Sequence, residues 1–260
     1  MNAVRRLKLV VAYDGGPFAG WQSQKGGNTV QDLLEAAFAD VGGQTVRVHG
    51  AGRTDAGVHA LAQCAHADVE SRLAAETWTA ALNASLPPAI RVVRSGYVGG
   101  EFHARFSARG KLYRYRIWND RYLSPFEQGR AWHVALPLDV DVLKREAAEF
   151  VGRHDFAGFA ANRGKSRRAD SSADEAEQST MRTIQSVRVR RTGKSITLEI
   201  RGDGFLYKMV RLMVGALVRV ASGRSPRGEI ATRLADPTLK SEGARNVAPA
   251  CGLYLVRVLY

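Results

Sequence analysis

The stretch Ala51–Ala60 (AGRTDAGVHA) places a carboxylate and an arginine together in a glycine-rich turn. Arg53 and Asp55 are two residues apart, so both side chains face the same side if the chain is extended there. A neighbouring guanidinium lowers the pKa of a carboxyl group and would keep Asp55 ionised, as a nucleophile or a base requires. The stretch therefore predicts a catalytic carboxylate. The alternative is an ordinary turn in which Asp55 caps a backbone N–H and Arg53 is solvated.

Basic and aromatic side chains are interleaved along Phe102–Arg116. In a strand, Tyr113 and Tyr115 would point to one face and the arginines beside them to the other. Aromatic rings stack on unpaired bases and arginines pair with phosphates, which favours an RNA ligand and makes Arg105 and Arg114 candidate RNA contacts. The alternative, a half-buried strand with core tyrosines, is favoured for Tyr115 more than for Tyr113.

A third candidate feature is a stripe of basic and small residues near the C-terminus. Lys208, Arg211, Gly215 and Arg219 follow one another at i, i+3, i+7 and i+11, so they share one face of a helix predicted over Tyr207–Ala221. Such a stripe is usually a solvated charged face. The sharper interpretation is a buried Arg211 paired with a carboxylate, with Lys208 as a further candidate RNA contact.

Composition restricts the classes of protein. The chain has 260 residues, and Lys+Arg (38) exceed Asp+Glu (25), giving a net charge of +13 that suits a polyanionic partner such as nucleic acid or an anionic membrane surface. No apolar run approaches the roughly 18 residues of a membrane span. The two cysteines exclude a disulfide framework and a four-cysteine zinc site, and they suggest a reduced, cytoplasmic compartment. The six histidines show no compact spacing with cysteines or carboxylates, and no phosphate-loop, dinucleotide or serine-hydrolase motif occurs. The sequence offers a carboxylate, arginines and tyrosines, so we expect chemistry without a metal or redox cofactor.

Hydrophobic periodicity in the first hundred residues predicts a β-α-β-β-α-β unit, as in ferredoxin-like folds. The first helix should begin at a capping box, with Thr29 as the N-cap, and end at Gly42-Gly43. The predicted elements are, in order, strand Leu7–Tyr13, helix Val30–Val41, strands near Thr45–His49 and Gln63–Val69, helix Ala74–Asn83 and strand Ile90–Val98.

The second half has a similar order of elements without a strict sequence repeat. Segment Asn162–Gln178 has charged residues and no large apolar residue, which indicates a flexible surface insertion. The order of elements predicts an α+β fold with a mixed or antiparallel sheet. The predicted elements are strand Leu112–Trp118, helix Val140–Val151, a hairpin of Ser186–Arg191 with Ile196–Arg201, helix Tyr207–Ala221 and strand Leu253–Tyr260.

A set of short motifs occurs in order over nearly the whole chain: Tyr13-Asp14-Gly15, Gly20-Trp21-Gln22, Ala51–His59, Asn83 with Leu86-Pro87, Phe102–Ala108, Tyr113-Arg114-Tyr115, His154-Asp155-Phe156, Met209-Val210-Arg211 and Gly252–Leu255. In this order they resemble the motifs of the TruA family of tRNA pseudouridine synthases. The resemblance implies a pseudouridine synthase fold: two ferredoxin-like (RRM-like) halves, residues 1–104 and 105–260, sharing a mixed, largely antiparallel sheet with a central cleft.

The same resemblance implies the activity and the roles of single residues. The implied enzyme is a homodimer that isomerises uridines 38, 39 and 40 of the tRNA anticodon stem-loop. Asp55 matches the catalytic aspartate, Tyr113 the tyrosine that stacks on the uracil, and Arg211 the arginine that pairs with the aspartate. Arg53 matches an arginine that holds the target nucleotide out of the stack, and Leu253 lines the uracil pocket. The family usually has a shorter segment where this chain has 162–178.

Two rival interpretations remain at this level. A non-catalytic RNA-binding protein of the same architecture would use the basic charge and Tyr113 equally well, but it gains nothing from a carboxylate in its RNA-binding cleft. A metal-free hydrolase using Asp55 and His59 is weaker, because no second carboxylate or nucleophile–base pair stands nearby in the sequence.

Overall fold

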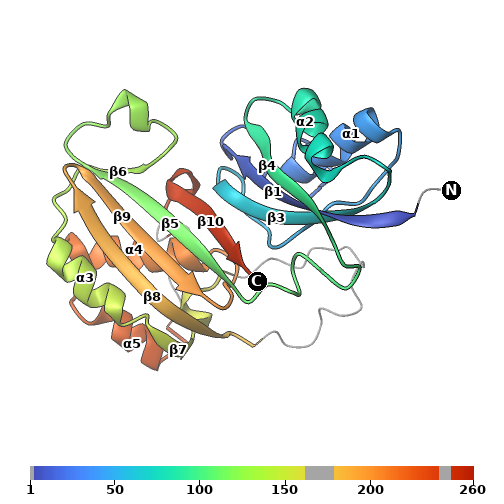
Figure 1. Cartoon of the computed structure of the whole chain (residues 1–260). Helices are drawn as coiled ribbons and strands as arrows, with labels where there is room; N and C mark the ends of the chain where they lie inside the picture. The colour runs from blue at the N-terminus through green and yellow to red at the C-terminus, as the bar shows by residue number, and fades with distance from the viewer. Residues whose placement is uncertain (1–2, 162–178, 240–246) are drawn as a thin grey trace. The chain divides into compact units, whose positions relative to one another are not determined.

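The structure, a computed structural model, describes residues 3–161, 179–239 and 247–260 (Figure 1). The predicted insertion 162–178 lies outside these residues. The chain divides into two compact units, one formed by Met1–Arg114 with Ala250–Tyr260 and the other by Tyr115–Pro249. No helix among the described residues is long and apolar enough to cross a membrane.

The first unit is a sheet whose strands lie in the order β4-β1-β3-β10-β5. β1 runs antiparallel to both β3 and β4, whereas β10 runs parallel to β3, so the sheet is mixed. Helices α1 and α2 pack on this unit, where Phe38 and Trp78 make a tilted ring contact at 5.3 Å. The elements are β1 (Val4–Tyr13), α1 (Val30–Gly42), β2 (His49–Gly50), β3 (His59–Glu70), α2 (Ala75–Ser85), β4 (Ile90–Val98), the start of β5 (Gly110–Asn119) and β10 (Leu253–Leu259).

The ends of α1 follow the local signals. The Thr29 hydroxyl accepts from the Asp32 backbone N–H, the Asp32 carboxylate accepts from the Thr29 N–H, and together they complete the predicted capping box. Gly43 ends the helix in the left-handed region at φ 63°, a conformation that costs glycine little. Both predicted boundaries are confirmed.

The strand predicted near Thr45–His49 is present only as β2, His49–Gly50, which pairs with β3, and residues 45–48 form no strand. Side-chain hydrogen bonds hold this segment in place of a longer strand. The Gln44 amide bonds both the N–H and the carbonyl of Glu70, and the Val48 N–H donates to the Glu35 carboxylate at 2.9 Å. These residues bury Val46 and Val48 without extending the sheet.

The second unit has a strand order of β5-β9-β8-β7, with β6 parallel to β5. The predicted hairpin is confirmed and turns at Gly193, whose φ is 57°. Together the units confirm the α+β class with a mixed sheet. The elements are β6 (Trp132–Val134), α3 (Val140–Ala148), β7 (Gly152–Asp155), β8 (Met181–Thr192), β9 (Ser195–Gly202), α4 (Met209–Ala221) and α5 (Glu229–Ala235), with 3-10 turns η1 (Pro125–Glu127), η2 (Ala157–Phe159) and, in the first unit, η4 (Ala250–Gly252).

Two predicted helix boundaries in this unit are wrong. α3 ends at Ala148 rather than Val151, because the chain turns to enter β7 at Gly152, which has a φ of 121°. α4 begins at Met209 rather than Tyr207, because Lys208 adopts a left-handed conformation with φ 58°. Lys208 therefore lies at the N-cap and does not continue the helical stripe.

Candidate active site

The Asp55 turn is held to the rest of the first unit by its backbone. The Trp21 N–H donates to the Thr54 carbonyl at 3.1 Å, and the Val58 N–H donates to the Asp55 carbonyl at 3.1 Å. The buried Thr54 hydroxyl bonds the Tyr13 phenol at 2.8 Å. Since Thr54 points inward, Arg53, which is exposed, and Asp55, which is half-buried, lie on the outer side of an extended segment. The side chains alternate as the sequence predicts.

Two glycines after β1 allow this turn to be approached closely. A Cβ on Gly15 would lie 2.0 Å from the Val58 carbonyl oxygen, and one on Gly20 would lie 2.8 Å from the Thr54 carbonyl oxygen. Gly20 also has a φ of 94°, which side chains rarely adopt. Nothing local to the turn predicts this role of Gly15 and Gly20, although they belong to the Tyr13-Asp14-Gly15 and Gly20-Trp21-Gln22 motifs.

His59 ties the turn to the start of β10. Its Nδ1 accepts the Gly15 N–H at 3.0 Å, its Nε2 lies 3.1 Å from the Cys251 carbonyl, and its ring stacks on Tyr254 at 4.6 Å. A neutral ring with its proton on Nε2 satisfies both bonds. A protonated ring would instead donate from Nδ1 to the Asp14 carboxylate, 3.1 Å away. Because both ring nitrogens are engaged in a buried position, the geometry does not support the Asp55/His59 hydrolase.

Tyr113 lies on β5 in the same unit, with only 8% of its surface exposed. Burial raises the pKa of its phenol, and the charge that Tyr13 would carry if ionised and the negative charge of Asp55 raise it further. Tyr113 is therefore a neutral phenol within electrostatic reach of Asp55. Tyr115 is fully buried and donates from its hydroxyl to the Pro249 carbonyl at 2.7 Å, as a core residue does.

Leu253 begins β10 and is 6% exposed. The parallel register pairs Tyr254 with His59 and Leu255 with Ala60, so Leu253 lies level with Val58 at the end of the turn. The first unit thus brings Leu253 to the same end of the sheet as Asp55.

The predicted RNA-contacting arginines of the first unit differ in surroundings. The Arg53 Nε donates to the Gln22 side-chain oxygen at 3.2 Å, which holds this exposed guanidinium beside the Asp55 turn. Arg105 is exposed, and its guanidinium lies 5.4 Å from the centre of the Phe106 ring. Arg114 is half-buried on the face of β5 opposite Tyr113.

Arg211 and Lys208 belong to the second unit. The Arg211 Nε donates to the Ala248 carbonyl at 2.7 Å, and the Ala248 N–H donates to the Arg211 carbonyl at 3.1 Å. These bonds fasten α4 to the segment that leads into η4. The Lys208 ammonium lies 5.1 Å from the centre of the Tyr207 ring. The ion pair of Arg211 with Asp55 remains a prediction.

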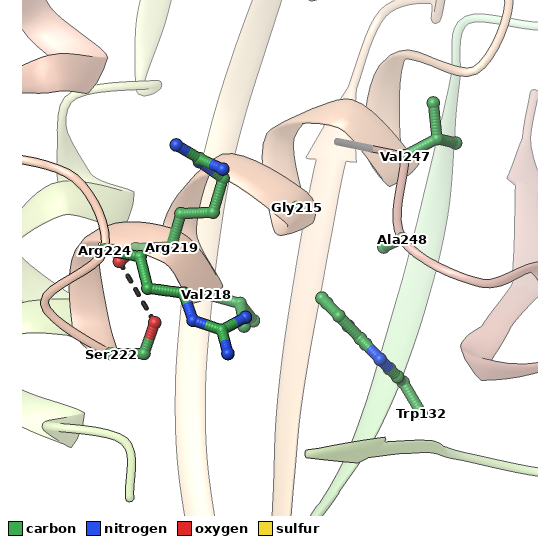
Figure 2. Close-up of a pocket in the computed structure, with 8 residues that line it drawn as sticks. All are labelled: Trp132, Gly215, Val218, Arg219, Ser222, Arg224, Val247 and Ala248. Carbon is green, nitrogen blue, oxygen red and sulfur yellow. Dashed lines mark hydrogen bonds between the residues drawn. The ribbon is translucent and has the colours of Figure 1, made fainter. Parts of the chain in front are cut away.

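A small pocket opens beside α4, and Figure 2 shows the side chains around it. Gly215 and Arg219 of the predicted stripe line it, and the Arg219 Nε donates to the Ser225 hydroxyl at 3.1 Å. The Trp132 indole stands across the pocket from α4 (Figure 2). The other lining residues are Val218, Ser222, Arg224, Val247 and Ala248.

Three imidazoles form a separate cluster on the first unit. The ring of His66 lies 5.0 Å from that of His49 and 4.7 Å from that of His103. Burial, together with the positive charges that its two neighbours could carry, lowers the pKa of His66 to about 4. The described residues contain no group of three or more His, Cys, Asp or Glu that could hold a metal ion.

The His66 pKa predicts a loss of stability in acid. The unfolded chain binds this proton near pH 6.5 and the folded protein only near pH 4, so the unfolded state gains protons first as the pH falls. The free energy of unfolding should therefore drop by roughly 3 kcal/mol between pH 6.5 and 4. Urea unfolding at several pH values measures it. His66→Gln should flatten this dependence, and an equal slope in the variant would contradict the prediction.

The chain matches a protein family and several of its named members. A family model described as tRNA pseudouridine synthase matches residues 9–107 and 147–260. The chain is 48% identical over 257 residues to tRNA pseudouridine synthase A of Akkermansia muciniphila, covering 98% of this chain and 95% of that protein. Proteins of the same name from Acetivibrio thermocellus and Solibacter usitatus are 41% and 43% identical, each covering 99% of this chain and 100% of the relative.

Proposed function

Because the chain belongs to the tRNA pseudouridine synthase family, we propose that it isomerises uridine to pseudouridine in tRNA, with Asp55 as the catalytic carboxylate. The observation that carries the proposal is the Asp55 turn, fixed by the backbone of Trp21 and Val58 within electrostatic reach of the neutral phenol of Tyr113. The proposed targets are uridines 38, 39 and 40 of the anticodon stem-loop.

The reaction breaks the N1–C1′ bond of uridine, forms a C5–C1′ bond, releases the C5 proton and adds a proton to N1, with no net redox change. The target base must first leave the stack, at a cost of a few kcal/mol. The exposed guanidinium of Arg53, held beside the turn by Gln22, can fill the gap that the base leaves. An ionised Asp55 can then attack C1′, attack C6 or remove the 2′ proton, and all three first steps use the same carboxylate.

The other site residues fit roles around the uracil. A neutral Tyr113 offers an aromatic face for stacking and a hydroxyl beside the base. Leu253 supplies an apolar wall from the start of β10. Arg211, already oriented by Ala248, is the proposed partner that keeps Asp55 ionised.

The proposal extends to the architecture and the partners. Two ferredoxin-like halves would form a central cleft, and the enzyme would act as a cytoplasmic homodimer. The net charge of +13 supports binding to the tRNA backbone. The proposed phosphate contacts are Arg105, Arg114 and Lys208, and their loss should weaken binding uniformly across tRNA sequences.

Release of tritium from tRNA labelled at uracil C5 tests the function. The purified protein should release tritium with EDTA present as well as without it, since no step calls on a metal. If the protein binds tRNA but releases no tritium from any tRNA, the enzyme proposal is wrong, and the result supports the alternative of a non-catalytic RNA-binding protein with the same architecture.

Tyr113→Phe separates the two roles of this tyrosine. The variant keeps an aromatic face but lacks the hydroxyl, so tRNA affinity should stay within about twofold while single-turnover release falls by roughly 100-fold or more, as for loss of an acid–base group. Tyr113→Leu should lose both. If Tyr113→Phe released tritium at the wild-type rate, the hydroxyl would take no part in the proton transfer, and Tyr113 would act only by stacking on the uracil.

A further inference from the structure

Phe106 is an aromatic residue that the catalytic proposal does not use. Its side chain is 75% exposed, although it belongs to a compact turn just before β5. The turn is fixed by His103, whose Nδ1 accepts the N–H groups of Arg105 and Phe106 at 3.1 and 3.3 Å. The His103 N–H donates to the Ser107 hydroxyl at 3.0 Å, and the Ser107 N–H donates to the His103 carbonyl at 2.9 Å. The exposed ring is therefore held in place by its own turn.

Two further rings connect Phe106 to the sheet, those of His103 and of His66 on β3. The Phe106 ring lies 4.3 Å from the ring of His103, which meets the buried His66 at 4.7 Å edge-on. His66 in turn accepts the Ala104 N–H on its Nδ1 at 3.2 Å, and Tyr260 donates to the Ala104 carbonyl at 2.7 Å. Because both imidazoles use Nδ1 as an acceptor, they are neutral at physiological pH, in keeping with their lowered pKa values. One face of the Phe106 ring is thus backed by a rigid support.

The chemistry beside the ring is that of a nucleotide site. The Arg105 guanidinium lies 5.4 Å from the Phe106 ring centre, so a flat apolar surface and a positive charge are presented together. Unpaired bases stack on such rings with little sequence preference, and the adjoining phosphate pairs with an arginine. A lone exposed apolar residue is common, but a ring braced by two imidazoles and flanked by a guanidinium is a more specific arrangement.

We propose that Phe106, backed by His103 and flanked by Arg105, is a stacking site for one unpaired base of the tRNA substrate. The proposal rests on the proposed function, because tRNA supplies the base. His66 lies seven residues along β3 from His59, about 23 Å at the rise of a strand, whereas the Asp55 carbonyl is bonded by the Val58 N–H beside His59, so the stacking site and Asp55 lie toward opposite ends of β3. The base that it holds is therefore a different one from the uridine that is isomerised, and the site acts on binding.

The dissociation constant of a tRNA transcript tests the stacking. Phe106→Ala should raise it about tenfold, within the range measured for losing one stacked base. Phe106→Leu should weaken binding as much, because leucine keeps apolar surface without an aromatic face, whereas Phe106→Trp should bind at least as tightly as the wild type. Phe126→Ala removes a phenylalanine that is 87% exposed in the second unit and serves as the matched control. Equal effects of the two alanine variants, or wild-type affinity of Phe106→Leu, would overturn the proposal.

A cycle with abasic nucleotides then identifies the base. One unpaired position of the tRNA, made abasic, should weaken binding to the wild type by the same factor as Phe106→Ala, and should have no further effect on that variant. If every abasic position weakens binding to the wild type and to the variant by equal factors, Phe106 holds no base and the proposal is wrong.

Tritium release separates this proposal from the function itself. At saturating tRNA, Phe106→Ala should release tritium at a single-turnover rate within about threefold of the wild type, because the chemistry is elsewhere. If the wild type releases tritium and Phe106→Ala binds tRNA with unchanged affinity, the stacking site is refuted and the proposed enzyme activity is not. Weakened affinity without any release by the wild type would refute the enzyme and leave the stacking site standing.

Discussion

Asp55→Asn should release no measurable tritium from C5-labelled tRNA while binding that tRNA within about tenfold of the wild type, or roughly 1.4 kcal/mol. Asparagine keeps the shape of the side chain, and the backbone bonds that fix the turn, from Trp21 to Thr54 and from Val58 to Asp55, do not involve the carboxylate. What is lost is the negative charge, which each proposed first step of the reaction requires. Turnover should therefore disappear while the fold is kept and the affinity for tRNA stays within this range.

The control must separate catalysis from general charge. Asp141→Asn removes one carboxylate from the surface of α3, where its side chain is 76% exposed, and so makes the same change in net charge. It should release tritium like the wild type. Turnover at the wild-type rate in Asp55→Asn would remove Asp55 from the mechanism, and an equal loss in both variants would attribute the effect to charge.

Gly15→Ala should damage the site without touching a chemical group. The new Cβ would lie 2.0 Å from the Val58 carbonyl oxygen, so one of the two backbone segments must move. Since the Val58 N–H holds the Asp55 carbonyl, a movement of about 1 Å reaches the catalytic residue and should cost on the order of 100-fold in release rate. The same overlap should lower the free energy of unfolding by roughly 1–3 kcal/mol.

Gly96→Ala is the matched control, because a Cβ at this β4 position would meet nothing within 4 Å. It should change neither the release rate nor the urea midpoint by much. Both variants can be compared in urea unfolding and single-turnover release at 25 °C. If Gly15→Ala were as active and as stable as Gly96→Ala, the close contact between Gly15 and Val58 would not position Asp55.

Local signals in the sequence predicted those parts of the fold that depend on neighbours along the chain. Thr29 and Asp32 are three residues apart and form their capping box within one turn of helix. The outward placement of Arg53 and Asp55 follows from the alternation of an extended segment around the buried Thr54. The hairpin around Gly193 likewise depends on a single turn.

Contacts between distant segments could not be predicted in this way. The strand expected near Thr45–His49 is shortened to His49–Gly50, and the Gln44 side chain just before it bonds the backbone of Glu70, a partner 26 residues away. The hydrogen bond between His59 and the Cys251 carbonyl joins residues 192 apart, and no residue near His59 in the sequence predicts it. Lys208 was assigned to a helix by periodicity, but its left-handed backbone places it one residue before α4. The spacing of residues shows which of them share one face of a helix, but contacts with the rest of the protein determine the residue at which the helix begins.

The most direct test of the central claim uses tRNA labelled at C5 and carrying a single uridine at position 38, 39 or 40. The purified wild-type protein should release one equivalent of tritium from each such tRNA and convert that nucleotide to pseudouridine. A tRNA with cytidine at all three positions should release none. Release that persists from the cytidine control, or absence of release from all three uridine substrates while the tRNAs bind, would contradict the proposed isomerisation in the anticodon stem-loop.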